Sequence, residues 1–292
     1  MAHADYLWAT DQGQKANLMN AIALKIVSRE EGERSVGAAK VRGLMAHDNY
    51  WMVDNEDYDE VSKEAETAMQ MIEEKLGKSN FLIVSEKHTL ASICITKAEH
   101  TPDKEEASEL LGKAERLEAD CLAILTATLG DHNPFTASIF MNIGVVFRES
   151  GKNSEAEEML TKALEIRQKI LGESFGVAVS HHHLATFYFE NIKEYEKAES
   201  HFIQNMKIYE KLHGPAYSGL GNIYSWLISV YEETNDIEKE EEILKKKDDW
   251  EKLQEEKKDK EEDNDEKEEQ EQKEMTLEEL IKFVTVSDAI EP

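Results

Sequence analysis

The sequence predicts an all-α fold, a right-handed superhelical solenoid of about five helical hairpins, followed by an acidic linker and a short C-terminal helix. Two observations lead to it. Residues 153–172 read NSEAEEMLTKALEIRQKILG, and 42 positions later residues 195–214 read YEKAESHFIQNMKIYEKLHG. Only 4 Pro and 14 Gly occur among 292 residues, and 40% are hydrophobic, which favours helices around a core. Self-similarity at a fixed interval is the signature of stacked repeats.

The repeated passage predicts the second helix of each hairpin, here called helix B. An alanine opens the pattern and a glycine closes it 16 residues later, as in Ala156 to Gly172 and Ala198 to Gly214. Apolar residues between them follow the 3.6-residue helical period, so one face is expected to be buried. The closing glycines suit a left-handed conformation after the helix, and they are Gly77, Gly130, Gly172 and Gly214.

A second pattern precedes each helix B and predicts the first helix of the hairpin, helix A. It joins a large apolar residue, a usually small one and an aromatic, as in Ile143-Gly144-x-x-Phe147. The small residue allows close approach of the neighbouring helix. Other copies of the pattern begin at Leu90, Leu184 and Leu227. The copy that begins at Leu90 has Cys94 in the aromatic position, so Cys94 is expected in the core.

The spacing of the copies predicts where the hairpins differ. One extra residue falls in the turn between helices A and B of the unit that holds Tyr188. Eleven extra residues lie between Cys94 and Ala114, about three helical turns, so that hairpin is expected to be longer. Its turn is predicted at Thr101-Pro102-Asp103, with Pro102 at the first position of helix B.

These patterns divide the chain into four parts. Residues 254–274 contain no hydrophobic residue, so they form either a solvated single helix or a disordered linker. The predicted parts are an N-terminal helical segment (1–34), the solenoid (35–253, with units of about 35–77, 78–130, 131–172, 173–214 and 215–253), the acidic Glu/Lys-rich linker (254–274) and a short amphipathic tail (275–292).

The two-helix unit with its small and aromatic positions resembles the tetratricopeptide repeat, and the 42-residue spacing resembles kinesin light chains. Residues 78–292 resemble more closely the C-terminal half of the amyloid protein-binding protein 2 family. The likeness rests on AEEMLTKALEIRQKILG, on HGPAYSGLGNIYSWLISVYEETNDIEK and on DDWEKLQ with a detached TLEELIKFV. It implies a substrate receptor of a cullin–RING ubiquitin ligase that recognises C-terminal degrons with an arginine near a terminal glycine. It also implies a link to microtubule-associated transport of the amyloid precursor. The family's ligase-docking box has no convincing counterpart before residue 35.

Charge and composition exclude several classes of protein. The 62 acidic and 34 basic residues give a net charge of −28, which repels nucleic acid and anionic lipid. The sequence contains no recognisable catalytic motif or phosphate-binding loop, so neither enzymatic activity nor a cofactor is expected. Two cysteines and the lack of a signal peptide or an 18-residue apolar run predict a cytoplasmic protein, with nuclear or partner-mediated membrane association left open.

Helix A of each hairpin lines the concave side of a solenoid. Its residues that face away from the packing stripe point into the groove and are candidates for peptide binding. The candidates are Ser138, Met141, Asn142, Val145, Arg148, Glu149, His182, His183, Thr186, Phe189, Glu190, Asn222, Ser225, Trp226, Ser229 and Glu233. Arg148 is the only Lys or Arg in residues 134–150, whereas glutamates end the A helices. The inner surface is therefore expected to be negative and to prefer basic or Arg-containing peptide tails.

Two further features have simple interpretations. His181, His182 and His183 point about 100° apart on a helix and are not expected to converge on a metal ion. Trp51 and Trp250 are expected to pack at unit boundaries.

The solenoid and the family resemblance predict protein partners, among them the elongin–cullin ligase core. Self-association through the exposed solenoid edges is a further alternative.

Overall fold

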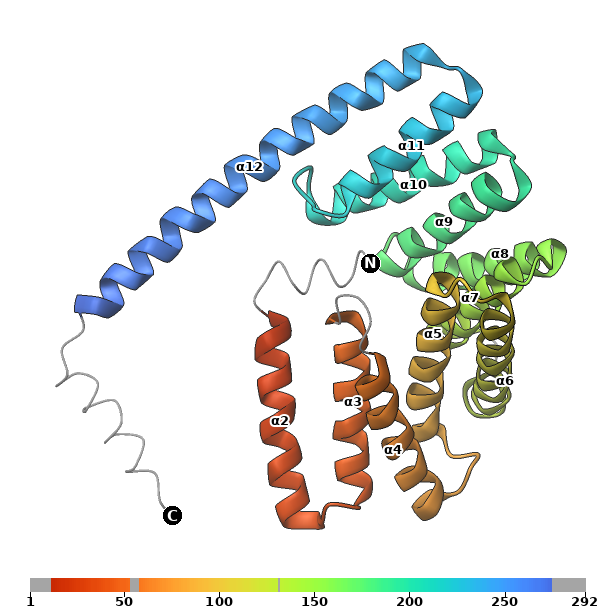
Figure 1. The fold of residues 1–292 in the computed structure, drawn as a ribbon, viewed down its shortest axis with the longest axis vertical. Helices are drawn as coiled ribbons and strands as arrows, with labels where there is room; N and C mark the ends of the chain where they lie inside the picture. The colour runs from red at the N-terminus through yellow and green to blue at the C-terminus, as the bar shows by residue number, and fades with distance from the viewer. Residues whose placement is uncertain (1–11, 53–57, 131, 275–292) are drawn as a thin grey trace.

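The computed structural model describes residues 12–52, 58–130 and 132–274, and these fold entirely as helices and connecting turns. After α2 (Gln12–Glu31) the helices follow one another in antiparallel pairs around a curve (Figure 1). The pairs are α3 (Val36–Met52) with α4 (Tyr58–Leu76), α5 (Val84–His100) with α6 (Lys104–Leu129), α7 (Pro134–Glu149) with α8 (Asn153–Leu171), α9 (Phe175–Phe187) with α10 (Tyr195–His213), and α11 (Leu220–Thr234) with α12 (Ile237–Glu274).

Contacts between the first helices of the pairs fix the direction of curvature. Helix α5 contacts both α3 and α7, and α7 contacts α9, in addition to the contacts within each pair. The first helices therefore pack along the inner side, and the predicted all-α solenoid is confirmed. Two short elements, η1 (Phe81–Ile83) and the π-helical η2 (Tyr188–Ile192), join helices of this array.

The small residues of the repeat motif allow the two helices of a pair to pack closely, as the sequence predicts. A Cβ on Gly144 of α7 would lie 2.7 Å from Cγ of Leu160 of α8, so only glycine allows this approach of the two helices. In the next pair Ala185 fills the equivalent position and is fully buried. Ala156 and Ala198, which open the second helices, are also fully buried. Cys94 is 5% exposed and lies in the main core, as predicted.

The extra residue of one turn is taken up by η2. At the end of α7 the carbonyl of Phe147 accepts a hydrogen bond from the N–H of Lys152, five residues later. In the next pair the carbonyl of Tyr188 accepts from the N–H of Glu194, six residues later, because the π-helical turn holds one more residue. The turn thus closes with the same kind of bond despite its greater length.

The α5–α6 hairpin is longer than its neighbours, as its sequence spacing predicts. Helix α5 continues for six residues beyond Cys94, whereas α7 continues for two beyond Phe147. Ten residues of α6 precede Ala114, but only three of α8 precede the equivalent Ala156. Both helices of the hairpin therefore extend past the array at one end.

One detail of this hairpin differs from the prediction. Pro102 was expected at the first position of the helix, but α6 begins at Lys104 and Pro102 precedes the cap. Asp103 takes the N-cap position, where its side chain accepts hydrogen bonds from the N–H groups of Glu105 (2.9 Å) and Glu106 (3.3 Å). The aspartate cap satisfies two of the first N–H groups of α6, which have no partner within the helix.

The closing glycines have the positive φ that the sequence predicts, but the ψ angles of Gly130, Gly172 and Gly214 are extended. Gly214 has φ 81° and ψ 174°, and Gly130 has φ 78° and ψ 177°. This region is open essentially to glycine alone and is more restrictive than the left-handed helical region.

Replacement of Gly214 by alanine is expected to lower the free energy of unfolding by about 1–3 kcal/mol. A Cβ there meets nothing within 4 Å, so the cost comes from the backbone alone. Urea denaturation followed by circular dichroism measures it. The matched control is Gly112→Ala in the middle of α6, where a Cβ meets only the Arg116 side chain at 3.7 Å and helix propensity should raise stability by up to about 1 kcal/mol. A Gly214→Ala protein as stable as the wild type would contradict the prediction.

The acidic segment 254–274 is helical, which decides between the two alternatives of a single helix and a disordered linker. Helix α12 runs without a break to Glu274, through the Asp-Asn-Asp sequence at residues 263–265. Its first half closes the stack, since Nε1 of Trp250 donates to the carbonyl of Tyr217 at 2.9 Å and the ring covers Gly221. Trp250 thus packs at the end of the array as predicted. The tail 275–292, residues 1–11 of the N-terminal segment and the Trp51 side chain lie outside the described residues.

Candidate peptide-binding surface

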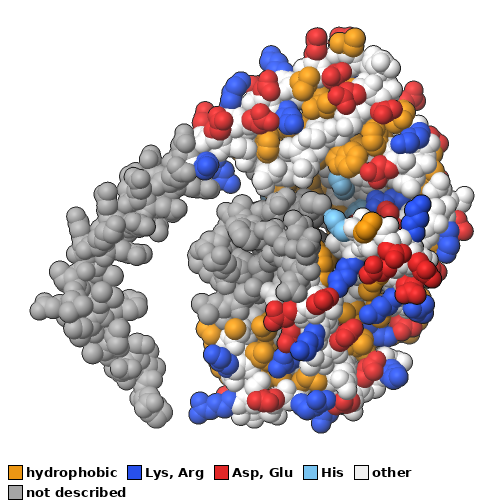
Figure 2. Space-filling view, in the orientation of Figure 1, with side chains coloured by type: hydrophobic (Ala, Val, Ile, Leu, Met, Phe, Trp, Pro, Cys, Tyr) orange, Lys and Arg blue, Asp and Glu red, His pale blue; other side chains and the backbone are white. Residues whose placement is uncertain are grey.

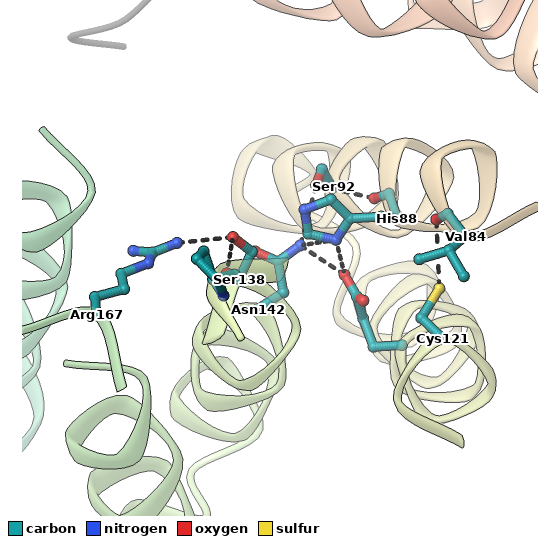
Figure 3. A network of polar contacts seen from close by, with 9 residues as sticks. Val84, His88, Ser92, Cys121, Ser138, Asn142 and Arg167 are labelled. Atoms are coloured by element: carbon teal, nitrogen blue, oxygen red, sulfur yellow. Dashed lines mark hydrogen bonds and ion pairs between the residues drawn. The ribbon is translucent and has the colours of Figure 1, made fainter. Parts of the chain in front are cut away.

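A polar network links the inner helices α5 and α7 through α6 (Figure 3). The Asn142 amide nitrogen donates to Oε1 of Glu118 at 2.6 Å and to Oγ of Ser92 at 3.0 Å. Nδ1 of His88 lies 2.8 Å from the same Glu118 oxygen. Burial opposes protonation of His88, but the fully buried Glu118 carboxylate outweighs it and raises the pKa of the imidazole. The network therefore favours His88 as the cation that balances Glu118.

A second polar group lies farther along α7 toward its N-terminus. The guanidinium of Arg167 on α8 donates to Oγ of Ser138 at 2.9 Å and lies 3.3 Å from Sδ of Met141. Ser138 and Met141 are both half-buried. Two predicted inner residues of α7 thus meet an arginine from the outer helix of the same pair.

The C-terminal end of α7 carries more negative than positive charge. Arg148 donates to Glu149 at 2.7 Å, to Glu99 at 3.0 Å and to the Thr186 hydroxyl at 3.3 Å. Burial raises the pKa of Glu99, Arg148 lowers it, and the nearby Glu149 and Glu190 carboxylates raise it further. One guanidinium therefore pairs with two carboxylates, those of Glu99 and Glu149, and the Glu190 carboxylate of η2 adds a third negative charge near Glu99.

An aromatic cluster with members on α9, η2, α10 and α11 adjoins these acids. The half-buried Trp226 ring stacks on Phe202, with centroids 5.6 Å apart and planes 12° apart. Phe189 meets the same indole edge-on at 5.6 Å, and His182 lies 6.5 Å from it. On the face drawn in Figure 2, histidine and hydrophobic side chains gather at the inner margin of the curve. The cluster offers an apolar surface beside the carboxylates.

The exposure of the predicted peptide-binding residues divides them into two groups. Glu149, Glu190, Asn222, Ser225 and Glu233 are exposed, and Ser138, Met141, His182, His183, Phe189, Trp226 and Ser229 are half-buried. The structure corrects the expected exposure of Asn142, Val145, Arg148 and Thr186, which are 4–9% exposed. The reason is that neighbouring inner helices pack against α7 on both sides. Val145 belongs to the core, and the other three make the internal hydrogen bonds described above.

The three consecutive histidines point in different directions. Nδ1 of His181 lies 2.8 Å from Nδ1 of His201, His182 faces the aromatic cluster, and the buried Nδ1 of His183 has no hydrogen-bond partner. Across residues 12–52, 58–130 and 132–274, no three His, Cys, Asp or Glu side chains are grouped to hold a metal ion. No described helix combines the length and apolar character needed to cross a membrane.

Comparison with known proteins agrees with the hairpin geometry. Residues 105–169 match the tetratricopeptide repeat. Those residues are most of α6, all of α7 and most of α8, so the match covers the packing of one repeat against the next. No curated protein matches the sequence significantly. The tetratricopeptide solenoid is typical of non-enzymatic modules that bind other proteins.

One solved structure shares the fold at low sequence identity, and a second is similar to a lesser degree. The crystal structure of BtubC (BKLC) from P. vanneervenii is 19% identical with a TM-score of 0.59, over 83% of this chain and 89% of that one. A putative kinesin light chain with nearly identical TPR-like repeats from Podosopora anserina is 18% identical with a TM-score of 0.47, over 73% and 99%. These comparisons do not confirm the more specific resemblance to the amyloid protein-binding protein 2 family.

Proposed function

We propose that this chain is a non-enzymatic scaffold whose inner face binds a basic, arginine-containing peptide. The observation that carries the proposal is the excess of carboxylates near the ends of the inner helices, where Glu149 and Glu190 both act on Glu99 and Arg148 pairs with only Glu99 and Glu149. Each carboxylate also lies at a helix C-terminus, where the backbone carbonyls add negative potential. A peptide guanidinium would offset both.

The aromatic cluster supports a peptide rather than a free cation as the ligand. Trp226 and Phe189 are half-buried and contact each other, and Phe189 directly precedes Glu190 in the sequence. Tyr195 packs on Phe189 and donates to Glu233 at 3.1 Å, which brings a second carboxylate near the rings. Partly exposed aromatic rings next to acids favour an arginine stem with its charged end, because the guanidinium stacks as well as pairs.

In the finer form of the proposal, the scaffold is a substrate receptor of a cullin–RING ubiquitin ligase. Its ligands are then C-terminal degrons with an arginine near a terminal glycine. This form rests on the resemblance to the amyloid protein-binding protein 2 family. Affinity purification of the chain from cells, followed by a search for elongin and cullin, tests it, and their absence would remove this form while leaving the peptide scaffold.

The alternative is a microtubule- or kinesin-linked cargo adaptor in amyloid precursor-type protein trafficking. An adaptor would bind internal cargo motifs without requiring a free C-terminus. Peptides with amidated C-termini separate the two readily: equal binding of acid and amide favours the adaptor, and loss of binding on amidation favours the degron receptor.

On a peptide array, the chain is expected to retain arginine-containing peptides and to release those in which alanine replaces arginine. Glu190→Gln should weaken binding of the retained peptides about tenfold, because one charge-assisted contact is lost. Glu158→Gln is the matched control, since Glu158 is an exposed glutamate on the second helix α8. Equal retention of arginine and alanine peptides would defeat the proposal.

A further inference from the structure

Helix α2 exposes three large apolar side chains on the face that points away from the array. Met19, Ile22 and Ile26, here called the α2 stripe, are 66%, 44% and 51% exposed, and their spacing of three and four residues places them on one side of the helix. No other described helix exposes three large hydrophobic side chains. Single apolar residues are ordinary on a surface, whereas a contiguous stripe marks a contact.

The opposite face of α2 already packs on the array. Leu24 and Val27 lie against a core cluster that includes residues of α3, and the amide nitrogen of Asn20 donates to Asp48 of α3 at 2.9 Å. Helix α3 is the main neighbour of α2, whereas a second helix inside the array, such as α8, contacts the helices before and after it. The α2 stripe therefore lies at the end of the solenoid, on the side with no neighbouring repeat.

Basic side chains accompany the α2 stripe. Lys25 and Arg29 are exposed, each three residues after a member of the stripe, and neither forms an ion pair with another described residue. Residues 12–52 contain six basic and four acidic residues, in a chain whose net charge is −28. On the face drawn in Figure 2, hydrophobic and basic side chains gather over the lower part of α2. A matching partner is amphipathic and acidic.

The C-terminal tail of this chain has that character. Its sequence TLEELIKFV at residues 276–284 predicts a short helix that begins with a capping box and has one apolar side, formed by Leu277, Leu280, Ile281 and Val284. Residues 261–279 contain eleven acidic residues and two lysines. A helix this short is marginal in water by itself, so it needs a surface on which to pack.

Helix α12 carries the tail back toward α2. Its 38 residues make it about 57 Å long at 1.5 Å per residue. In Figure 1 it leaves the α11 end of the array and runs along the open side of the curve, so its C-terminal end lies on the same side of the molecule as α2. The tail begins directly after this end, at residue 275.

We propose that residues 276–284 pack as an amphipathic helix on the α2 stripe of the same chain, with their glutamates beside Lys25 and Arg29. The contact removes two apolar surfaces from water and brings the acidic end of the chain to its basic end. It joins the first and last helices of the solenoid. Because it uses the outer face of α2 and none of the peptide-binding residues, it is independent of the proposed function.

A nitroxide label on the tail of the full chain tests this contact. Ser287→Cys carries the label, because the two native cysteines, Cys94 and Cys121, are buried. The label is expected to broaden the methyl NMR signals of the α2 stripe and to leave that of Ile170, which is 43% exposed on α8, unchanged. Sharp signals throughout the stripe, or equal broadening at Ile170, would overturn the proposal.

Two further measurements locate the contact. Ile22→Asp should abolish the broadening at Met19 and Ile26, because a carboxylate in the apolar contact is costly, whereas Ile170→Asp should leave it as it is in the labelled parent. Both side chains are exposed, at 44% and 43%, so neither variant disturbs the core. Chains that carry only methyl labels are then mixed with chains that carry only the nitroxide. Broadening in the mixture would assign the tail to a second copy and refute the contact within one chain, as would broadening that survives Ile22→Asp.

Discussion

Acidification from pH 7.5 to pH 5 is expected to lower the stability of the α9–α10 pair, because its histidines are buried in the neutral form. Burial, aided by His201, lowers the pKa of His181 to about 4, and burial with nearby Lys197 lowers that of His201. The two Nδ1 atoms share one hydrogen bond at 2.8 Å, which requires at least one neutral ring. Tyr188 stacks on His201 at 5.7 Å, so a charged pair has no room to separate.

The direction of the change in stability with pH follows from which state of the chain binds the proton more tightly. The unfolded chain protonates His181 near pH 6.5 and the folded chain only near pH 4, so this stability is complete above pH 6.5 and is lost as the pH falls toward 4. At pH 5 the loss is about 2 kcal/mol for His181. Urea denaturation at the two pH values measures it.

Matched variants separate the contribution of the His181–His201 pair from that of the other groups that titrate between pH 7.5 and pH 5. His181→Gln should reduce the difference in unfolding free energy between pH 7.5 and pH 5 by about 2 kcal/mol. His132→Gln removes an exposed histidine before α7 and should leave the difference as it is in the wild type. If the wild type and His181→Gln lose the same stability on acidification, the buried pair is not the cause.

The fold could be predicted because its information is local. Each hairpin repeats the same small and buried positions, and Gly144 against Leu160 shows that the small residue does set the distance between helices. The closing glycines and the extra residue before Glu194 could be placed for the same reason, since a turn is decided by a few adjacent residues. Pro102 was misplaced because Asp103 competes for the cap and supplies a side-chain acceptor.

The inner surface could be predicted only in part, because exposure depends on the packing of neighbouring repeats. Periodicity assigned Asn142 and Val145 to the open side of α7, but α5 and α9 press against that side. Arg167 was missed because cations were sought on the first helices only. Alignment of the second helices on their closing glycines would have revealed both Arg167 and Glu118, charged residues at positions that are uncharged in the other repeats.

Glu86→Gln is expected to stabilise the protein, in contrast to most core substitutions. Glu86 lies in the first turn of α5 and is 4% exposed. Its carboxyl packs against Gly43 of α3, where the absence of a side chain leaves room for it. Its Oε2 has no hydrogen-bond partner among the described residues. Burial raises the pKa of Glu86 to about 7, with some offset from its own backbone N–H. Near neutral pH the fold therefore buries a charge that nothing balances.

The effect of pH on stability through Glu86 is opposite to its effect through the histidines. The folded chain binds the Glu86 proton more tightly than the unfolded chain, so this group costs stability as the pH rises from about 4.5 to about 7. At pH 8 the cost is about 2–4 kcal/mol, and glutamine, which has the same shape and no charge, should recover most of it. Glu241→Gln on the exposed face of α12 removes the same unit of net charge and controls for general repulsion. Because Glu86 keeps its proton to a higher pH in the folded chain than in the unfolded chain, the advantage of Glu86→Gln over Glu241→Gln must grow between pH 5 and pH 8. An advantage that stays constant would mean that burial does not raise the pKa of Glu86.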